Sequence, residues 1–171
     1  MTKIFAHRGA SAYAPENTME AFELAAKQGA EGIELDVHVT KDGEVVVTHD
    51  EKIDRVSNGS GFIKDMTLRE LKRLSFHNHM ESYVGAGIPT LREVLEYVST
   101  TNMDVNIELK TGIYWYPQIE EKTAFIVQET GMHDRVIYSS FNHHSIAKIK
   151  EIDSTAETAW LFSDVILNVE Q

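Results

Sequence analysis

The stretch EGIELDVHVTKDGEVVVTHD, residues 31–50, carries the pattern that decides the fold. Between residues 32 and 40 apolar and polar side chains alternate, which is the period of a β-strand. The apolar side chains at 33, 35, 37 and 39 would share one face, and Glu34, Asp36 and His38 would share the other. Two carboxylates and an imidazole in a row on one face predict either an antiparallel strand facing water or part of a functional site.

The bulk composition is that of one ordinary globular domain. The chain has 171 residues, of which 42 % are hydrophobic and 25 % are charged. Its net charge of -11 argues against nucleic acid and anionic membrane surfaces as the main partners, because both are polyanions. The absence of cysteine excludes disulfides, zinc–thiolate sites and thiol catalysis. We expect a cytoplasmic protein without a signal peptide or an integral membrane segment.

Strands and helices alternate along the chain. We expect strands to begin near residues 3, 32, 45, 104, 135 and 156, with helical patterns between most of them. The strand near residue 45 follows the turn signal Lys41-Asp42-Gly43, so it is either a hairpin partner of the preceding strand or a third strand of a barrel. This alternation predicts a parallel sheet covered by helices.

Local signals indicate where the helices begin. Asn17 is predicted as the N-cap of the first helix, with Glu20 as its capping-box partner. Two further capping boxes are expected, Thr67 with Glu70 and Thr90 with Glu93.

Ionisable side chains gather where several of these strands end. KIFAHRG ends in His7 and Arg8, VVVTHD ends in His49, and DVNIELK turns Glu108 and Lys110 toward its polar face. For any one strand, a face in water explains the pattern about as well as a site does. Taken together they favour a site, because active sites of parallel α/β folds lie at the carboxyl ends of the strands.

Convergence of these faces would bring three carboxylates together, those of Glu34, Asp36 and Glu108. Like charges at such range require a cation or proton uptake, and ligand sets of oxygen alone suit Mg²⁺ or Ca²⁺. Such an ion can act as a Lewis acid on a phosphoryl oxygen.

The remaining polar groups complete a set suited to phosphodiester cleavage. His7 and His49 would titrate near neutrality, as general acid–base catalysis requires. Arg8 and Lys110 would bring positive charge to an anionic substrate.

The segment AHRGASAYAPENTMEAFELAAKQGAEGIELDVHVTKDGEVVVTHD, residues 6–50, together with PTLREVL, NIELK and SSFN downstream, closely resembles the bacterial glycerophosphodiester phosphodiesterases. The resemblance covers the whole chain and rests on H-R-G, P-E-N-T, E-x-D, H-D and E-x-K in this order. It implies a TIM barrel and metal-dependent hydrolysis of glycerophosphodiesters to sn-glycerol 3-phosphate and an alcohol.

The same resemblance implies a role for each matched residue. The segment between residues 51 and 89 would be the small insertion of the family, which covers the barrel mouth and shapes substrate choice. Glu34, Asp36 and Glu108 would hold Mg²⁺ or Ca²⁺, His7 and His49 would be the acid–base pair, Arg8 would bind phosphate beside Lys110, and Glu16 of PENT would be a further polar site residue.

Neighbouring polar and aromatic residues are expected to play supporting parts. His38 is predicted to make a hydrogen bond rather than bind metal, and Asp50 is predicted to orient the loop after His49. The cluster Tyr114-Trp115-Tyr116 predicts either packing on the barrel rim or a wall of the substrate pocket.

The chain is short for this fold. A TIM barrel has about 250 residues, whereas these 171 residues end at SDVILNVEQ, before the last strands of the family. We therefore expect one domain over residues 1–171 with an incomplete barrel, whose exposed sheet edge favours a homo-oligomer or helical capping. Two alternative functions stay open, a lysophospholipase D-like phosphodiesterase on the same fold and a catalytically impaired metal-binding fragment or assembly module.

Overall fold

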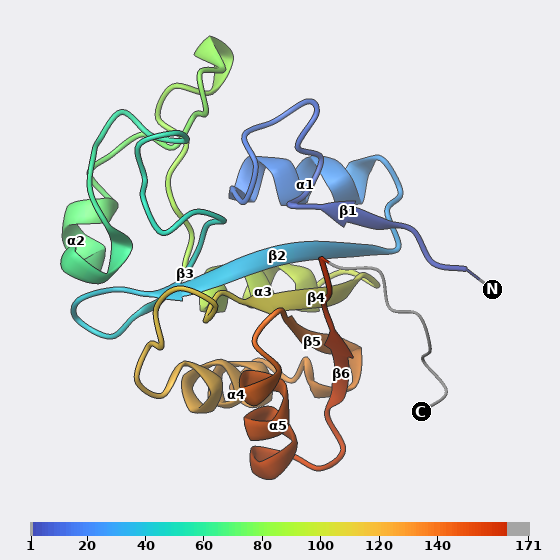
Figure 1. Cartoon of the computed structure of the whole chain (residues 1–171). Helices are drawn as coiled ribbons and strands as arrows, with labels where there is room; N and C mark the ends of the chain where they lie inside the picture. Colours follow the sequence, from blue (N-terminus) through green and yellow to red (C-terminus); the bar gives the residue numbers. More distant parts are fainter. Residues whose placement is uncertain (1, 164–171) are drawn as a thin grey trace.

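A computed structural model describes residues 2–163, and the end of the chain from residue 164 lies outside the described residues (Figure 1). The strands are β1 (Phe5–His7), β2 (Gly32–Val39), β3 (Val45–Val47), β4 (Asp104–Leu109), β5 (Val136–Ser140) and β6 (Glu157–Trp160). The α-helices are α1 (Met19–Lys27), α2 (Leu68–Leu71), α3 (Leu91–Ser99), α4 (Ile119–Glu129) and α5 (His143–Ile152), and short 3-10 turns cover Ile63–Asp65, Glu81–Tyr83 and His133–Arg135.

The sheet has the parallel β/α succession of a TIM barrel. Its order is β1-β2-β4-β5-β6, every neighbouring pair on this path is parallel, and the described residues leave β1 and β6 at its two edges. The β3 strand pairs antiparallel with the end of β2, so it is the hairpin partner and not a third parallel strand. The predicted α/β fold is confirmed for the described residues.

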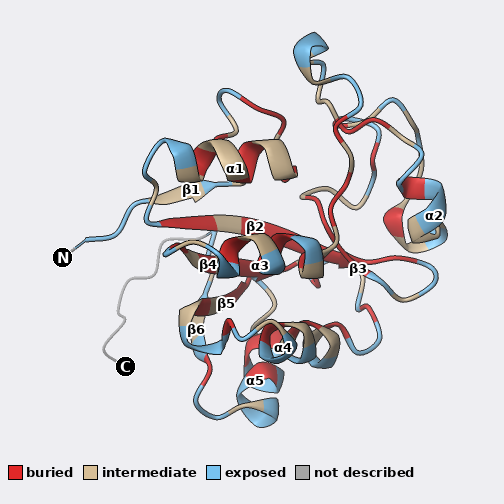
Figure 2. Cartoon of the chain, turned by 180° about the vertical axis from the view of Figure 1, so that it is seen from behind, coloured by how far each residue is buried: buried red, intermediate tan, exposed pale blue. Residues whose placement is uncertain are grey.

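The two faces of β2 serve different purposes. On one face, Ile33 lies beside Val105 of β4 in the sheet register, and both side chains are fully buried under the helices. The opposite face carries Glu34 beside His7 and Asp36 beside Glu108. Figure 2 shows the consequence, since β2 and β3 are buried while the outer surfaces of the helices are exposed. The helix-facing core contains buried residues of β2, β3, β4 and β5 together with residues of α1, α3, α4 and α5. The β1 strand contributes only the half-buried Ala6, which packs against this core.

The helix starts follow local capping chemistry, with one correction. The two capping boxes of Thr67–Glu70 and Thr90–Glu93 are confirmed. The N-cap predicted for α1 is wrong, because Thr18 rather than Asn17 caps this helix and accepts a hydrogen bond from the backbone N–H of Ala21. Asn17 instead adopts a positive φ of 57° and donates its amide to Asp36 at 2.8 Å. A contact between distant parts of the chain thus replaces the expected cap.

The segment 51–89 packs around a small hydrophobic cluster of its own. Ile53, Ile63, Leu71 and Ile88 are buried in it, and Val46 of β3 joins it to the sheet. Figure 1 shows this segment, including α2, beside the end of β2. Among residues 2–163 there is no helix with the length and apolarity that crossing a membrane requires.

Candidate active site

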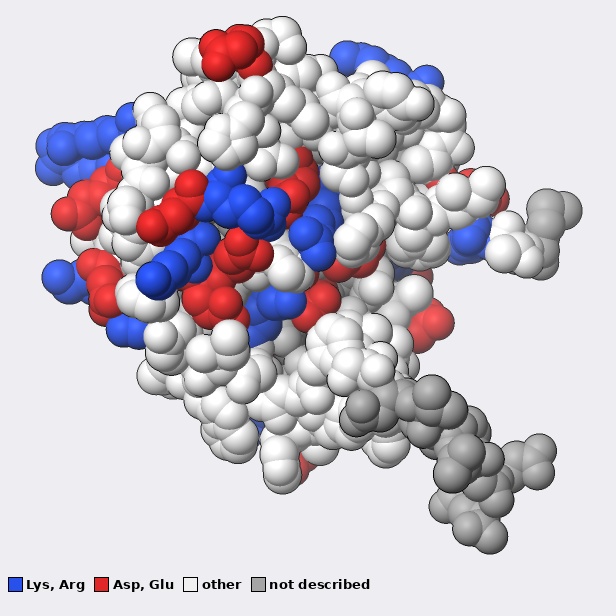
Figure 3. All heavy atoms as spheres, turned by 45° about the horizontal axis from the view of Figure 1, so that its top comes forward, with Lys and Arg blue, Asp and Glu red and all other residues white. Residues whose placement is uncertain are grey.

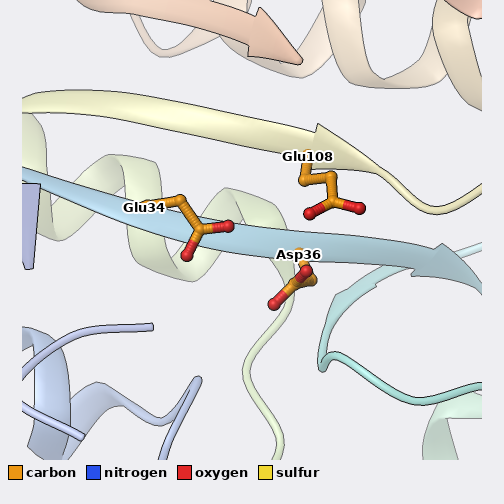
Figure 4. Close-up of side chains that lie close together, drawn as sticks. All are labelled: Glu34, Asp36 and Glu108. Atoms are coloured by element: carbon orange, nitrogen blue, oxygen red, sulfur yellow. The ribbon is translucent and has the colours of Figure 1, made fainter. Parts of the chain in front are cut away.

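Three carboxylates meet on the polar face shared by β2 and β4. Glu34, Asp36 and Glu108 each place one oxygen so that all three oxygens lie within 4.8 Å of one another. Figure 4 shows the three side chains on the same side of the two strands. The sheet register causes the meeting, because Asp36 lies directly beside Glu108 and Glu34 is two residues earlier on the same face.

Burial makes this cluster electrostatically costly without a cation. Burial and the Asp36 charge raise the pKa of Glu34 to about 8. Burial also raises the pKa of Glu108, although the hydrogen bond from Lys110 opposes that rise. Asp36 is fully buried, and its Oδ1 accepts no hydrogen bond from the described residues. Three carboxylates, one of which has a buried oxygen without a hydrogen bond, fit a hard divalent cation such as Mg²⁺ or Ca²⁺.

The end of β1 adds an imidazole and a guanidinium to the cluster. His7 Nε2 lies 3.8 Å from Glu34 Oε2, and the His7 side chain is largely exposed. The backbone N–H of Arg8 donates to the same Glu34 oxygen at 3.1 Å, which the positive φ of Arg8 (58°) allows. Arg8 Nε lies 3.5 Å from Asp36 Oδ2.

The end of β3 brings the second histidine from the other side. His49 Nδ1 donates to Asp50 Oδ1 at 2.6 Å, so its Nε2 is left as an acceptor. Lys110 Nζ lies 3.3 Å from this Nε2 and donates to Glu108 Oε1 at 2.9 Å. Lys110 therefore connects His49 to the carboxylate cluster. Asp50 holds the His49 ring itself, whereas the prediction from sequence assigned Asp50 to the loop that follows.

Glu16 lies in the loop after β1 and accepts hydrogen bonds from two arginines. Its Oε1 accepts hydrogen bonds from Arg8 at 3.1 Å and from Arg55 at 2.8 Å, and its Oε2 accepts one from Arg55 at 2.8 Å. These contacts hold the pKa of Glu16 below its usual value, and the hydrogen bond from Arg55 has the largest effect. Figure 3 shows basic and acidic side chains interleaved on one face of the molecule.

Two residues of this network were missed by sequence reasoning. Arg55 lies in the irregular segment after β3, where no periodicity indicates which way a side chain points. Asn17 was assigned to the cap of α1 instead of to Asp36. The PENT motif is the one signal that could have found Asn17, since it also contains Glu16.

His38 supports the site from inside the sheet. Its Nε2 donates to the backbone carbonyl of His49 at 3.0 Å, and its Nδ1 accepts from the Tyr116 hydroxyl at 2.9 Å. Burial lowers the pKa of His38. The predicted hydrogen-bonding role is confirmed. The residues of the cluster Tyr114-Trp115-Tyr116 lie in different surroundings. Tyr116 is buried and contacts His38, whereas Trp115 is exposed.

A cavity of about 170 Å³ opens beside Glu108 and Lys110. Glu51 contributes a carboxylate to its lining, and Ile113 and Phe141 contribute apolar walls. These two apolar side chains follow β4 and β5 and are more than half exposed. The candidate active site is therefore bordered by both charged and apolar surface.

The fold and the site define an α/β barrel protein with an acidic, cation-compatible centre at its strand ends. The family model "Glycerophosphoryl diester phosphodiesterase family" matches residues 7–168. A glycerophosphodiester phosphodiesterase of Caldanaerobacter subterraneus is 50 % identical over 152 residues, which cover 88 % of this chain and 63 % of the relative. One from Bacillus altitudinis is 49 % identical over 168 residues, covering 97 % and 69 %.

Solved structures of similar proteins indicate the same family. A phosphodiesterase of Oleispira antarctica, in complex with the product sn-glycerol-3-phosphate, matches with a TM-score of 0.88 at 31 % identity and covers 98 % of this chain and 68 % of that chain. A glycerophosphodiester phosphodiesterase of Agrobacterium tumefaciens matches with a TM-score of 0.84 at 37 % identity, covering 92 % and 66 %. This chain belongs to the glycerophosphoryl diester phosphodiesterase family. It spans 63 % and 69 % of the length of the two curated relatives named here.

Proposed function

We propose that this chain hydrolyses glycerophosphodiesters to sn-glycerol 3-phosphate and an alcohol, using a divalent cation. The observation that carries the proposal is the cluster of Glu34, Asp36 and Glu108, which His7 approaches from β1 and His49 approaches from β3. Family membership and the product-bound Oleispira relative support it.

The cation would be Mg²⁺ or Ca²⁺, held by the three carboxylates, and would polarise a phosphoryl oxygen of the substrate. Arg8 and Lys110 would bind the phosphate, because both present N–H donors beside the cluster. Glu16 would contribute by holding Arg8, since both of its oxygens already accept hydrogen bonds.

The two histidines would share the proton transfers. One would remove a proton from the nucleophile, and the other would protonate the leaving alcoholate. The hydrogen bond from His49 Nδ1 to Asp50 leaves Nε2 as the atom that exchanges a proton. His7 is open to solvent, which allows its proton to equilibrate with water.

The segment between residues 51 and 89 would cover the barrel mouth and influence substrate choice. The contacts of its Arg55 with Glu16 and Asp50 support this role. Association with another copy of the chain and a cytoplasmic location stay predictions.

A lysophospholipase D-like activity is the second candidate. Ile113 and Phe141 form exposed apolar walls of the cavity beside Lys110. An alcohol that carries an acyl chain could lie against this apolar surface, whereas a small polar alcohol would leave it in contact with water.

The decisive experiment measures glycerol 3-phosphate released from glycerophosphocholine and glycerophosphoethanolamine with Mg²⁺, with Ca²⁺ and with excess chelator. Release that needs a cation, disappears in Glu108→Ala and persists in the exposed control Glu129→Ala is the expected result. Choline release from lysophosphatidylcholine measures the second candidate. A folded chain that binds the cation but cleaves none of these substrates would contradict both functions and favour a binding or assembly module.

A further inference from the structure

Arg55 joins two parts of the candidate site that are far apart in the sequence. Its Nη1 and Nη2 donate to the two oxygens of Glu16 at 2.8 Å each. Its Nε and Nη2 donate to Asp50 at 2.7 and 3.2 Å. The planar fork of a guanidinium can serve two carboxylates in this way, whereas the single ammonium group of a lysine cannot reproduce it.

Each of these two carboxylates holds a further residue of the site. Asp50 Oδ1 accepts a hydrogen bond from His49 Nδ1 at 2.6 Å, and Glu16 Oε1 accepts one from Arg8 at 3.1 Å. A continuous series of hydrogen bonds therefore runs from His49 to Arg8, and Arg55 is its central member.

The charges make this arrangement depend on Arg55. Burial by itself would raise the pKa of Asp50. Hydrogen bonds from Arg55 and His49 outweigh burial and lower this pKa to about 2. Glu16 also has a lowered pKa, with Arg55 as the main cause. Both partners are thus anions near neutral pH. Without Arg55, two carboxylates would stand next to an anionic substrate with less positive charge between them.

We propose that Arg55 is a positioning residue that holds the His49 ring through Asp50 and the Arg8 side chain through Glu16. Arg55 does not touch the reacting atoms. It keeps the group that transfers a proton and the group that binds phosphate in one mutual arrangement. The roles of His49 and Arg8 rest on the proposed function, whereas the contacts of Arg55 do not.

The first test does not require activity. Nitrogen NMR of the histidine rings reports whether the His49 proton resides on Nδ1. We expect an Nδ1–H form in the wild type and a mixture of both tautomers in Arg55→Ala and in Arg55→Lys. Arg73→Ala is the control, because this exposed arginine of the same segment makes no side-chain hydrogen bond among residues 2–163. An unchanged His49 in both Arg55 variants would overturn the proposal.

The second test measures turnover. Arg55→Ala and Arg55→Lys should each lower kcat by about 10- to 100-fold, because a small misplacement of a catalytic group has effects of this size. Mg²⁺ affinity, measured by calorimetry, should stay within about threefold, because the carboxylate cluster is not altered. A lower kcat with an unchanged Mg²⁺ affinity would distinguish a positioning role of Arg55 from a general loss of structure.

A double-mutant cycle completes the design. Combining Arg55→Ala with Asp50→Asn should reduce kcat by less than the product of the two single effects, because both changes remove the same support of His49. Fully multiplicative losses would overturn the proposal. If Arg55→Ala does not fold, Arg55→Lys serves in its place in both the cycle and the NMR test. If the wild type releases no glycerol 3-phosphate, the proposed function fails, and the NMR result alone decides the role of Arg55.

Discussion

The Nε2 atom of His38 lies 3.0 Å from the carbonyl oxygen of His49. One histidine inside the sheet thereby fixes the backbone of another at its edge. Because the carbonyl can only accept, His38 carries its proton on Nε2, and its Nδ1 accepts from Tyr116. This arrangement links the fold of β2 to the placement of a candidate catalytic group.

Removing this link should destabilise the chain. His38→Ala should lower the free energy of unfolding by about 2 to 4 kcal/mol, because it leaves buried polar groups unpaired and opens a cavity. Tyr116→Phe should cost about 1 to 3 kcal/mol. Urea unfolding measures both changes, with the exposed Tyr13→Phe as the control. Wild-type stability in both variants would show that these hydrogen bonds contribute nothing.

The two candidate catalytic histidines should both be necessary for turnover. His7→Ala and His49→Ala should each reduce kcat by about 100-fold or more, because each removes a general acid or base. Steady-state assays with glycerophosphocholine measure the effect, and the exposed His79→Ala is a suitable comparison because His79 lies outside the site. Near-normal turnover in either variant would refute that histidine's acid–base role.

Without a cation, stability should fall as the pH rises. The folded chain raises the pKa of Glu34 from 4.5 to about 8, so between these values the folded state keeps a proton that the unfolded state has lost. Stability is therefore greatest below about pH 4.5 as far as Glu34 is concerned, and its contribution is lost as the pH rises toward 8. Denaturant titrations in chelator at several pH values should show this slope, and Glu34→Gln should reduce it. An identical slope in the variant would rule out Glu34 as its source.

A bound cation should reverse this loss. At a Mg²⁺ or Ca²⁺ concentration about 100 times its Kd, the free energy of unfolding should rise by about 2.7 kcal/mol, because the ion binds only the folded state. Thermal unfolding of Glu108→Ala should show little response to the same ion. If the wild type also fails to respond, the carboxylate cluster does not bind that cation under these conditions.

The capping box of α3 should contribute measurably to stability. Thr90→Ala should reduce the free energy of unfolding by about 1 kcal/mol, because the side chain of Thr90 caps the Glu93 N–H at 3.2 Å. Thr90→Ser should retain most of this stability. Equal stability of the alanine and serine variants in urea would contradict the capping role.

The strand positions and the polar face of β2 were accessible to prediction because they depend on local periodicity. The meeting of Asp36 with Glu108 depends on the register between β2 and β4. In β2 the alternation alone separates Glu34 and Asp36 from the core residues between them. The role of β3 was left open because a run of three valines suits a hairpin and a parallel strand equally well. The short turn before it is the signal that decides, because a crossover between parallel strands needs a dozen or more residues.

The contacts that sequence reasoning missed join distant parts of the chain. Arg55 meets Glu16 across 39 positions, and Asn17 meets Asp36 across 19. No local signal specifies such pairs, since their geometry depends on how loops are folded over the strand ends. Asn17 also satisfied a local capping pattern, and the buried carboxylate of Asp36 prevailed over it.

The alternation in β2 also constrains how this protein can change during evolution. A one-residue insertion or deletion between residues 33 and 38 would exchange the two faces of the strand beyond it. Apolar side chains would then lie on the face that now carries the carboxylates, and the carboxylates would lie in the core under the helices. Natural selection for a folded chain alone therefore preserves the spacing of Glu34 and Asp36. Substitution can replace an individual carboxylate with little effect on the core, whereas a shift of their positions would disturb the packing of the whole strand.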